Sequence, residues 1–272
     1  MTEAPRMTDT QALAHRRRRT RAEALFLHAA AADEVQDRMA MVNKPFTSIA
    51  IVTGQPEFWA ERFPQATVLH DDDTLPFAPE AHDLIIHAMS LHWANDAVGQ
   101  LIQCRRALRP DGLFLAVAPG GQTLTELRAC LGQAEADVTG GLSPRIAPMA
   151  ELRDLGGLLQ RAGLALPVAD ANTHVASYAD AFALMRDLRA MGEGNALTGR
   201  VRQPTRRAVF DRAADLYQTH FGNSGGRISA TFDLIYLTGW APSDSQPKPL
   251  RPGSAQQRLA DALGTHETKL PD

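Results

Sequence analysis

Two neighbouring side chains near the middle of the chain combine an imidazole with an aromatic face. His92 and Trp93 follow the apolar stretch Asp83-Leu84-Ile85-Ile86 and a short polar segment. Because the free pKa of an imidazole lies near neutrality, His92 could act as a general base. The alternative is that both side chains pack or order a loop, and the residues alone favour it. His92 and Trp93 are therefore the candidate catalytic residues, with packing kept as the alternative.

A second group of residues has the types that bind a nucleoside. Asp71, Asp72 and Asp73 follow an apolar run, and carboxylates there could accept hydrogen bonds from ribose hydroxyls or an adenine amino group. Three adjacent acids also make an ordinary solvated turn, and the residues do not decide between the two. Upstream, a run of apolar residues ends in the single Gly54, with no G-x-G-x-x-G fingerprint after it.

Metal and hydrolase chemistry have little support in the sequence. His82, His87 and His92 recur every five residues, a spacing that does not cluster ligands on a strand, whose faces alternate every second residue. The chain has no H-E-x-x-H motif and no G-x-S-x-G elbow. We therefore predict no metal site and no serine-hydrolase triad.

The elements that must position these residues are predicted as alternating strands and helices. Strands are expected at 48–54, 66–70, 83–86, 113–118, 167–177 and 228–240. Helices are expected at 22–41, 57–63, 96–108, 123–138, 149–164, 178–191 and 204–220. Strand, helix and strand in succession favour a doubly wound α/β sheet, in which ligands bind beyond the carboxyl ends of the strands. The loop 87–93 lies at that edge.

Composition is that of an ordinary globular protein. The chain has 272 residues, of which 44% are hydrophobic and 22% charged, and a net charge of −3 gives no general attraction to nucleic acid. Its two cysteines suggest no disulfide framework, and no apolar run reaches the roughly 18 residues of a membrane span. A cytoplasmic location is expected. The basic run Arg16 to Arg21 predicts a solvated helix start, with an acidic partner or a lipid surface as the alternative.

The central stretch resembles the second half of a class I S-adenosylmethionine (SAM)-dependent methyltransferase domain. The residues that carry this likeness are LPF at 75–77, HDLII at 82–86 and RPDG at 109–112. The chain is more specifically similar to the arginine-hydroxylase group of mitochondrial complex I assembly factors and their bacterial relatives. Motifs typical of that group are SLHWAND at 90–96, GGQTLTELR at 120–128, GGLSPRI at 140–146, DLGGLLQRAG at 154–163 and DLRAMGEGN at 187–195.

The resemblance implies roles for individual residues. It places Asp71 near the adenine amino group of SAM and His87 near its methionine part, with Gly54 and Asp72 as further cofactor-binding residues. The family also carries a D-x-G-C-G-x-G turn after its first strand, where this chain keeps only Gly54. Only about twenty residues separate Gly54 from Leu75, so about one strand–helix unit is missing. We therefore expect a degenerate SAM site and a sheet that is one strand short.

The resemblance also implies an architecture and a function. The fold expected is a Rossmann-like methyltransferase sheet, mostly parallel with an antiparallel C-terminal strand and added helices. Residues 1–44 would be a basic helical extension, 45–240 the methyltransferase-like domain with a helical insertion at 178–220, and 241–272 an extended tail. The function expected is a methyltransferase acting on a protein substrate in respiratory complex I assembly. The alternative is a non-catalytic assembly factor that recognises a respiratory-chain subunit through the loops 142–145 and 191–195. The sequence does not predict the oligomeric state.

Overall fold

The structure is a computed structural model that describes residues 6–247 and 264. Residues Met1–Pro242 form one compact unit and Ser243–Asp272 form a second. In the second unit, the backbone N–H of Gln246 donates to the carbonyl of Ser243 in a turn. The expected extended tail from 248 onward, apart from 264, lies outside the described residues, as do residues 1–5.

A single sheet of six strands runs through the first unit, in the order β2-β1-β3-β4-β6-β5. The strands are β1 (Ile49–Thr53), β2 (Thr67–His70), β3 (His82–Ala88), β4 (Leu108–Gly120), β5 (Ala165–Tyr178) and β6 (Ile228–Trp240). The first four are parallel, and β6 is antiparallel to both β4 and β5. The expected mostly parallel sheet with an antiparallel C-terminal strand is confirmed.

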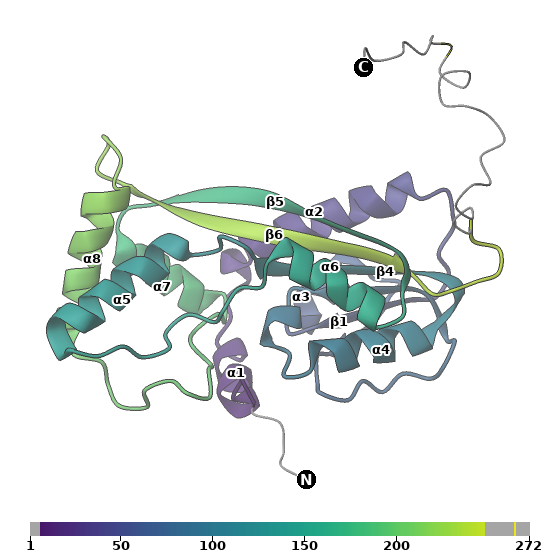
Figure 1. The fold of residues 1–272 in the computed structure, drawn as a ribbon, viewed down its shortest axis with the longest axis horizontal. Coiled ribbons are helices and arrows are strands. Elements are labelled where there is room, and N and C mark those ends of the chain that lie inside the picture. Colours follow the sequence, from purple (N-terminus) through teal and green to yellow (C-terminus); the bar gives the residue numbers. More distant parts are fainter. Residues whose placement is uncertain (1–5, 248–263, 265–272) are drawn as a thin grey trace, which may run out of the picture. The chain divides into compact units, whose positions relative to one another are not determined.

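Helices cover both faces of this sheet (Figure 1). They are α1 (Thr10–Arg17), α2 (Phe26–Met41), α3 (Pro56–Arg62), α4 (Ala97–Ala107), α5 (Thr125–Thr139), α6 (Leu152–Arg161), α7 (Ala181–Ala190) and α8 (Arg207–Phe221), with single 3₁₀ turns η1 (Ala22–Ala24) and η2 (Leu91–Trp93). Side chains alternate along each strand between two cores. Ile51 packs into the core that contains Trp59 of α3, whereas Val52 packs into the core that contains Leu101 of α4.

The shortened region between Gly54 and Leu75 leaves no gap between the strands of the sheet. With one strand–helix unit missing, β2 pairs directly with β1 as an edge strand, with Val52 opposite Leu69. On its other side Val52 lies opposite His87 of β3. The carboxyl ends of β1, β2 and β3 therefore meet at one edge, which brings Gly54, Asp71 and the loop after β3 together.

Residues 109–112, which lie between the predicted helix 96–108 and the predicted strand 113–118, are part of a longer strand. β4 already begins at Leu108, opposite His82, and its register shifts before Leu113 pairs with Leu84. Pro110 lacks an N–H, and Asp111 has a positive φ of 60°, so these residues bulge between the two paired parts of the strand. The prediction missed this because a turn signal and a bulge signal use the same residues.

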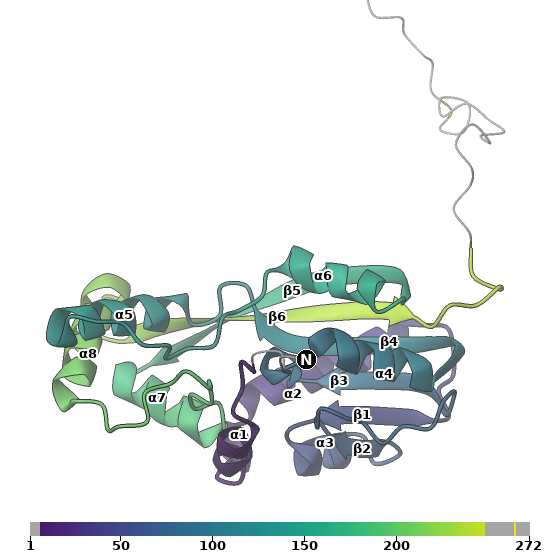
Figure 2. The same cartoon turned by 60° about the horizontal axis from the view of Figure 1, so that its bottom comes forward.

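The N-terminal segment, from Thr8 onward, contacts the rest of the first unit. Thr8 is 1% exposed, and it forms an isolated bridge with Leu197. The predicted helix at 22–41 is divided into η1 and α2, and a separate helix α1 precedes them. Both views place α1 between α7 and α3 (Figure 1 and Figure 2). None of the helices described here is both long and apolar enough to cross a bilayer.

Candidate functional site

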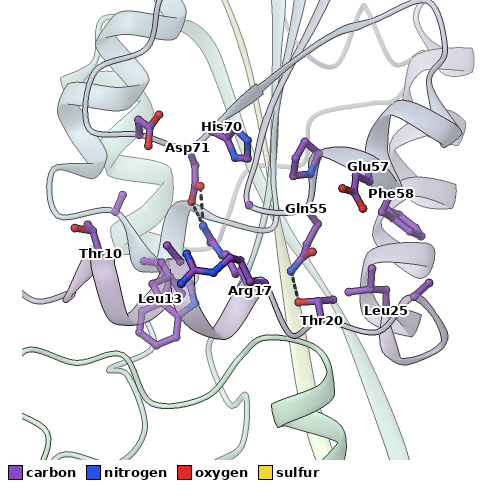
Figure 3. A pocket seen from close by; sticks show the side chains of 18 of the residues that line it. Thr10, Leu13, Arg17, Thr20, Leu25, Gln55, Glu57, Phe58, His70 and Asp71 are labelled. Atoms are coloured by element: carbon purple, nitrogen blue, oxygen red, sulfur yellow. Dashed lines mark hydrogen bonds and ion pairs between the residues drawn. The ribbon is translucent and has the colours of Figure 1, made fainter.

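A pocket of about 780 Å³ opens at the carboxyl edge of the sheet. It is lined by Gly54 after β1 and by Asp71 and Asp72 after β2, which we call its floor, and by residues of α1. Figure 3 shows Asp71 facing Arg17 of α1 across it. Trp93 of η2 also lines it. The structure thus brings together four of the six predicted site residues, namely Gly54, Asp71, Asp72 and Trp93.

The floor of this pocket is in contact with an arginine of the chain itself. Nη1 of Arg17, the last residue of α1, donates to both carboxylate oxygens of Asp71, at 2.7 and 2.9 Å. The two side chains are only 13% and 11% exposed. A Cβ atom on residue 54 would overlap the guanidinium group of Arg17, so Gly54 is the residue that leaves room for that group. Figure 3 shows Arg17 reaching from α1 to Asp71.

The residues of this pocket do not fit SAM in the conformation seen. In nucleotide-binding sheets of this kind, an acid at the end of the strand beside the glycine-bearing strand accepts the ribose hydroxyls, and the glycine lets the ligand approach the backbone. Here the glycine is Gly54, and the acid is Asp71 because β2 pairs directly with β1, whereas the resemblance placed Asp71 near the adenine amino group. Arg17 contacts both positions. A nucleoside would have to displace the guanidinium before it could make either contact.

His87 lies beneath the pocket and is not among its lining residues. Its side chain is completely buried, which lowers the pKa of the imidazole and keeps the ring neutral. Nε2 of His87 lies 2.7 Å from Oε1 of Gln100, whose Nε2 donates to the backbone carbonyl of Asp72. His87 is therefore positioned to order the acidic loop through Gln100. Its direct contact with a cofactor stays a prediction.

His92 and Trp93 share one acceptor. Nε2 of His92 lies 3.1 Å from Oε2 of Glu193, and Nε1 of Trp93 donates to the same oxygen over 2.8 Å. Burial alone would raise the pKa of Glu193, but the charge and hydrogen bond of His92, the charge of Arg17 and the indole N–H together lower it to about 2. The carboxylate is therefore ionised. Within the described residues, Nδ1 of His92 is buried and has no hydrogen-bond partner.

Arg17 and Glu193 are the two residues of the site that sequence reasoning missed. Arg17 belongs to the basic run that was expected to be a solvated helix start. That expectation is wrong for its first two arginines, because Arg17 binds Asp71 and Arg16 donates to the carbonyl of Asn195 over 2.6 Å. Arg18, Arg19 and Arg21 are exposed. The only sequence signal for Arg17 was its place next to a helix that precedes the first strand.

The loop 191–195 is partly internal, with 191 and 192 buried and 193–195 partly exposed, and its role as a recognition surface stays a prediction. Met191 is 1% exposed, and Gly192, with a φ of 83°, packs so closely against Thr20 that a Cβ atom would collide with it. The loop 142–145 is different. Its Ser143 and Arg145 are tied to Glu135, whereas Leu142 is 75% exposed. Only this second loop presents a large apolar side chain to solvent.

Comparison with known proteins shows which families and proteins this chain is similar to. Residues 28–116 match the family described as "Methyltransferase domain". The zebrafish (Danio rerio) protein named arginine-hydroxylase NDUFAF5, mitochondrial, is 39% identical over 198 residues, which cover 73% of this chain and 61% of that protein. The malonyl-[acyl-carrier protein] O-methyltransferase of Xylella fastidiosa is 36% identical over 184 residues, 68% of this chain and 60% of that protein.

The chain therefore contains a stretch, 28–116, that matches a methyltransferase-domain family, and it is similar to a protein named as a methyltransferase. It is also a homologue of the proteins named arginine-hydroxylase NDUFAF5. It spans about three fifths of the length of these curated relatives. The solved YcgJ protein of Bacillus subtilis is similar over 79% of this chain and 99% of its own, at 14% identity and a TM-score of 0.48.

Proposed function

We propose that this chain is a methyltransferase-fold assembly factor for respiratory complex I and that it works on a protein partner, a subunit of the respiratory chain. The observation that carries this proposal is its 39% identity with the zebrafish NDUFAF5 protein over 73% of the chain. We also propose 45–240 as the methyltransferase-like domain with its helical insertion, 1–44 as an extension, and a cytoplasmic location. Peripheral membrane contact would then fall to the exposed Arg18, Arg19 and Arg21.

In the conformation described, the protein supports recognition better than methyl transfer. A nucleoside needs access to the backbone at Gly54 and to the carboxylate of Asp71. Arg17 is in contact with both. The exposed Leu142, held on a loop that Glu135 anchors, is the apolar contact that we propose for the partner.

Gene deletion in the source organism tests this function. We expect membranes of the deletion strain to lose most NADH-dependent ubiquinone reduction and native gels to show little assembled complex I. Succinate-dependent quinone reduction, which does not use complex I, should be unchanged and serves as the control. Normal assembly of complex I in the deletion strain would overturn the proposal.

A second candidate function is SAM-dependent methylation of the same partner. It is favoured by the pocket of about 780 Å³ that persists beside Gly54 and Asp71, which exceeds the lower end of ligand-site volumes, about 300 Å³. Calorimetric titration of the purified protein with SAM and with S-adenosylhomocysteine tests it. Micromolar binding by the wild-type protein would favour this candidate over the non-catalytic one. Absence of heat both from the folded wild-type protein and from a folded Arg17→Ala variant, whose pocket lacks the guanidinium, would count against it.

A further inference from the structure

The segment 6–21, which we name the strap, crosses the pocket and is fixed to the chain on either side of it. At its start, the N–H of Thr8 donates to Asn95 Oδ1 over 2.9 Å, and Asp9 pairs with Arg200. At its end, the N–H of Arg21 donates to the carbonyl of Ala190 over 2.9 Å. The strap therefore joins the loop after β3 to the last residue of α7, Ala190.

One side chain of the strap enters the pocket floor. Arg17 lies over Gly54 and binds both oxygens of Asp71, and its neighbour Thr20 accepts a hydrogen bond from Gln55 over 2.9 Å (Figure 3). Both contacts reach the segment that follows β1 and β2, where a nucleoside would lie. The strap thus makes its pocket contacts through two hydrogen-bonding side chains, with Leu13 as an apolar support.

The ion pair and a ligand would compete for the same carboxylate. Charge-assisted hydrogen bonds that are largely shielded from water are stronger than neutral ones, and both partners here are almost fully covered. A ribose hydroxyl that approached Asp71 would have to replace the guanidinium and leave its charge without a partner. The apparent affinity for a nucleoside is lowered by the fraction of molecules in which Arg17 has left the pocket.

We propose that the strap is an autoinhibitory element in which Arg17 occupies the nucleoside half of the pocket, and that a SAM-type ligand binds when the strap is released. We call this autoinhibition the gate. It rests on the second candidate function, because that function supplies the identity of the ligand. It accounts for two observations that otherwise conflict, a well-formed pocket with a glycine and an acid in place and a chain segment that covers both.

Titration of the full chain with S-adenosylhomocysteine tests the gate, with wild-type protein and the variant Arg17→Ala compared. We expect Arg17→Ala to bind at least tenfold more tightly than wild type, equivalent to about 1.4 kcal/mol. Adding Asp71→Ala to that variant should remove the gain, because the freed carboxylate is the group that the ribose would use. Arg19→Ala is the matched control, since Arg19 is an exposed arginine of the same strap outside the pocket lining, and its affinity should equal that of wild type.

The outcomes separate the gate from the function on which it rests. Equal and measurable binding by wild type and Arg17→Ala would overturn the gate while leaving a SAM-binding protein. No binding by either folded protein would overturn both the gate and the second candidate function, and complex I assembly would remain a separate readout. If Arg17→Ala does not unfold cooperatively, Arg17→Met keeps the aliphatic stem and takes its place.

Discussion

Trp93 donates its indole N–H to Glu193 across a sequence separation of 100 residues, with 2.8 Å between Nε1 and Oε2. The same oxygen lies 3.1 Å from Nε2 of His92. One ionised carboxylate, 21% exposed, thus fixes the end of the loop after β3 against the segment that follows α7. His92 and Trp93, the predicted catalytic residues, are held in place by a residue that lies far from them in the sequence.

The Glu193 carboxylate should contribute measurably to stability. Glu193→Gln keeps the size of the side chain but removes the negative charge that His92 and Trp93 share. Hydrogen bonds to charged groups contribute about 1.5–3 kcal/mol, so we expect the free energy of unfolding in urea to fall by about 2 kcal/mol. Glu23→Gln, at an exposed position, is the control and should change it by less than about 0.5 kcal/mol. Equal values for the two variants would contradict a structural role of Glu193.

Trp93 should prove to be a packing residue as well as a pocket wall. It is 6% exposed and packs with Leu13, Ala147, Ala196 and Leu197 in a small core. We expect Trp93→Ala to lower the free energy of unfolding by about 3–5 kcal/mol, measured by urea denaturation followed by circular dichroism. A loss below about 1 kcal/mol would instead indicate that Trp93 is not needed for packing, and it would favour the catalytic role predicted from the sequence.

Stability should fall as the pH is lowered, and His28 should cause part of the loss. His28 is 3% exposed, its pKa is lowered by burial to about 4, and its Nδ1 accepts the indole N–H of Trp59. Between pH 6.5 and 4 the unfolded chain therefore binds a proton that the folded protein excludes, so stability rises with pH across this window, by about 3 kcal/mol in order of magnitude.

The variant His28→Gln isolates this contribution. Glutamine keeps an acceptor for Trp59 and does not titrate, so the variant should lose less stability than wild type between pH 6.5 and 4. Urea midpoints measured at half-unit steps of pH provide the comparison. Parallel pH curves for the two proteins would show that His28 is not the group responsible.

Leu142 should matter for assembly and not for folding. It is 75% exposed on a loop whose neighbours Ser143 and Arg145 are tied to Glu135. We expect Leu142→Ser to leave the melting temperature unchanged within about 1 °C and to restore less complex I activity than wild type in the deletion strain. Met41→Ser is the matched control, because Met41 is 81% exposed at the end of α2. Full complementation by Leu142→Ser would exclude this loop as the contact.

The sheet could be predicted from sequence because its signals are local. Apolar runs bounded by Gly, Pro and Asp marked each strand, and the short distance from Gly54 to Leu75 indicated the missing unit that the six-stranded sheet confirms. The separation of the strap from α2 was not predicted. Helix formers dominate residues 10–41, and the break at 18–21 coincides with a tertiary contact, the hydrogen bond from Arg21 to Ala190.

The site was only partly predictable, because two of its contacts are tertiary. Nothing in the run of arginines distinguishes Arg17 from Arg18, and only the fold places one against Asp71 and leaves the other exposed. Likewise, the glutamate of the loop 191–195 was expected on the surface and instead turns inward to His92. Residue types at strand ends predicted where a ligand would lie. Whether a ligand can bind there depends on the tertiary contact between Arg17 and Asp71.

A crystal structure of the wild-type protein grown with millimolar S-adenosylhomocysteine, beside that of Arg17→Ala, tests most directly whether Arg17 closes the pocket. For wild type we predict electron density for the guanidinium over Gly54, bound to Asp71, and none for an adenosyl group. For Arg17→Ala we predict an adenosyl group with its ribose on Asp71. An adenosyl group in the wild-type pocket, with Arg17 still bound to Asp71, would contradict the account.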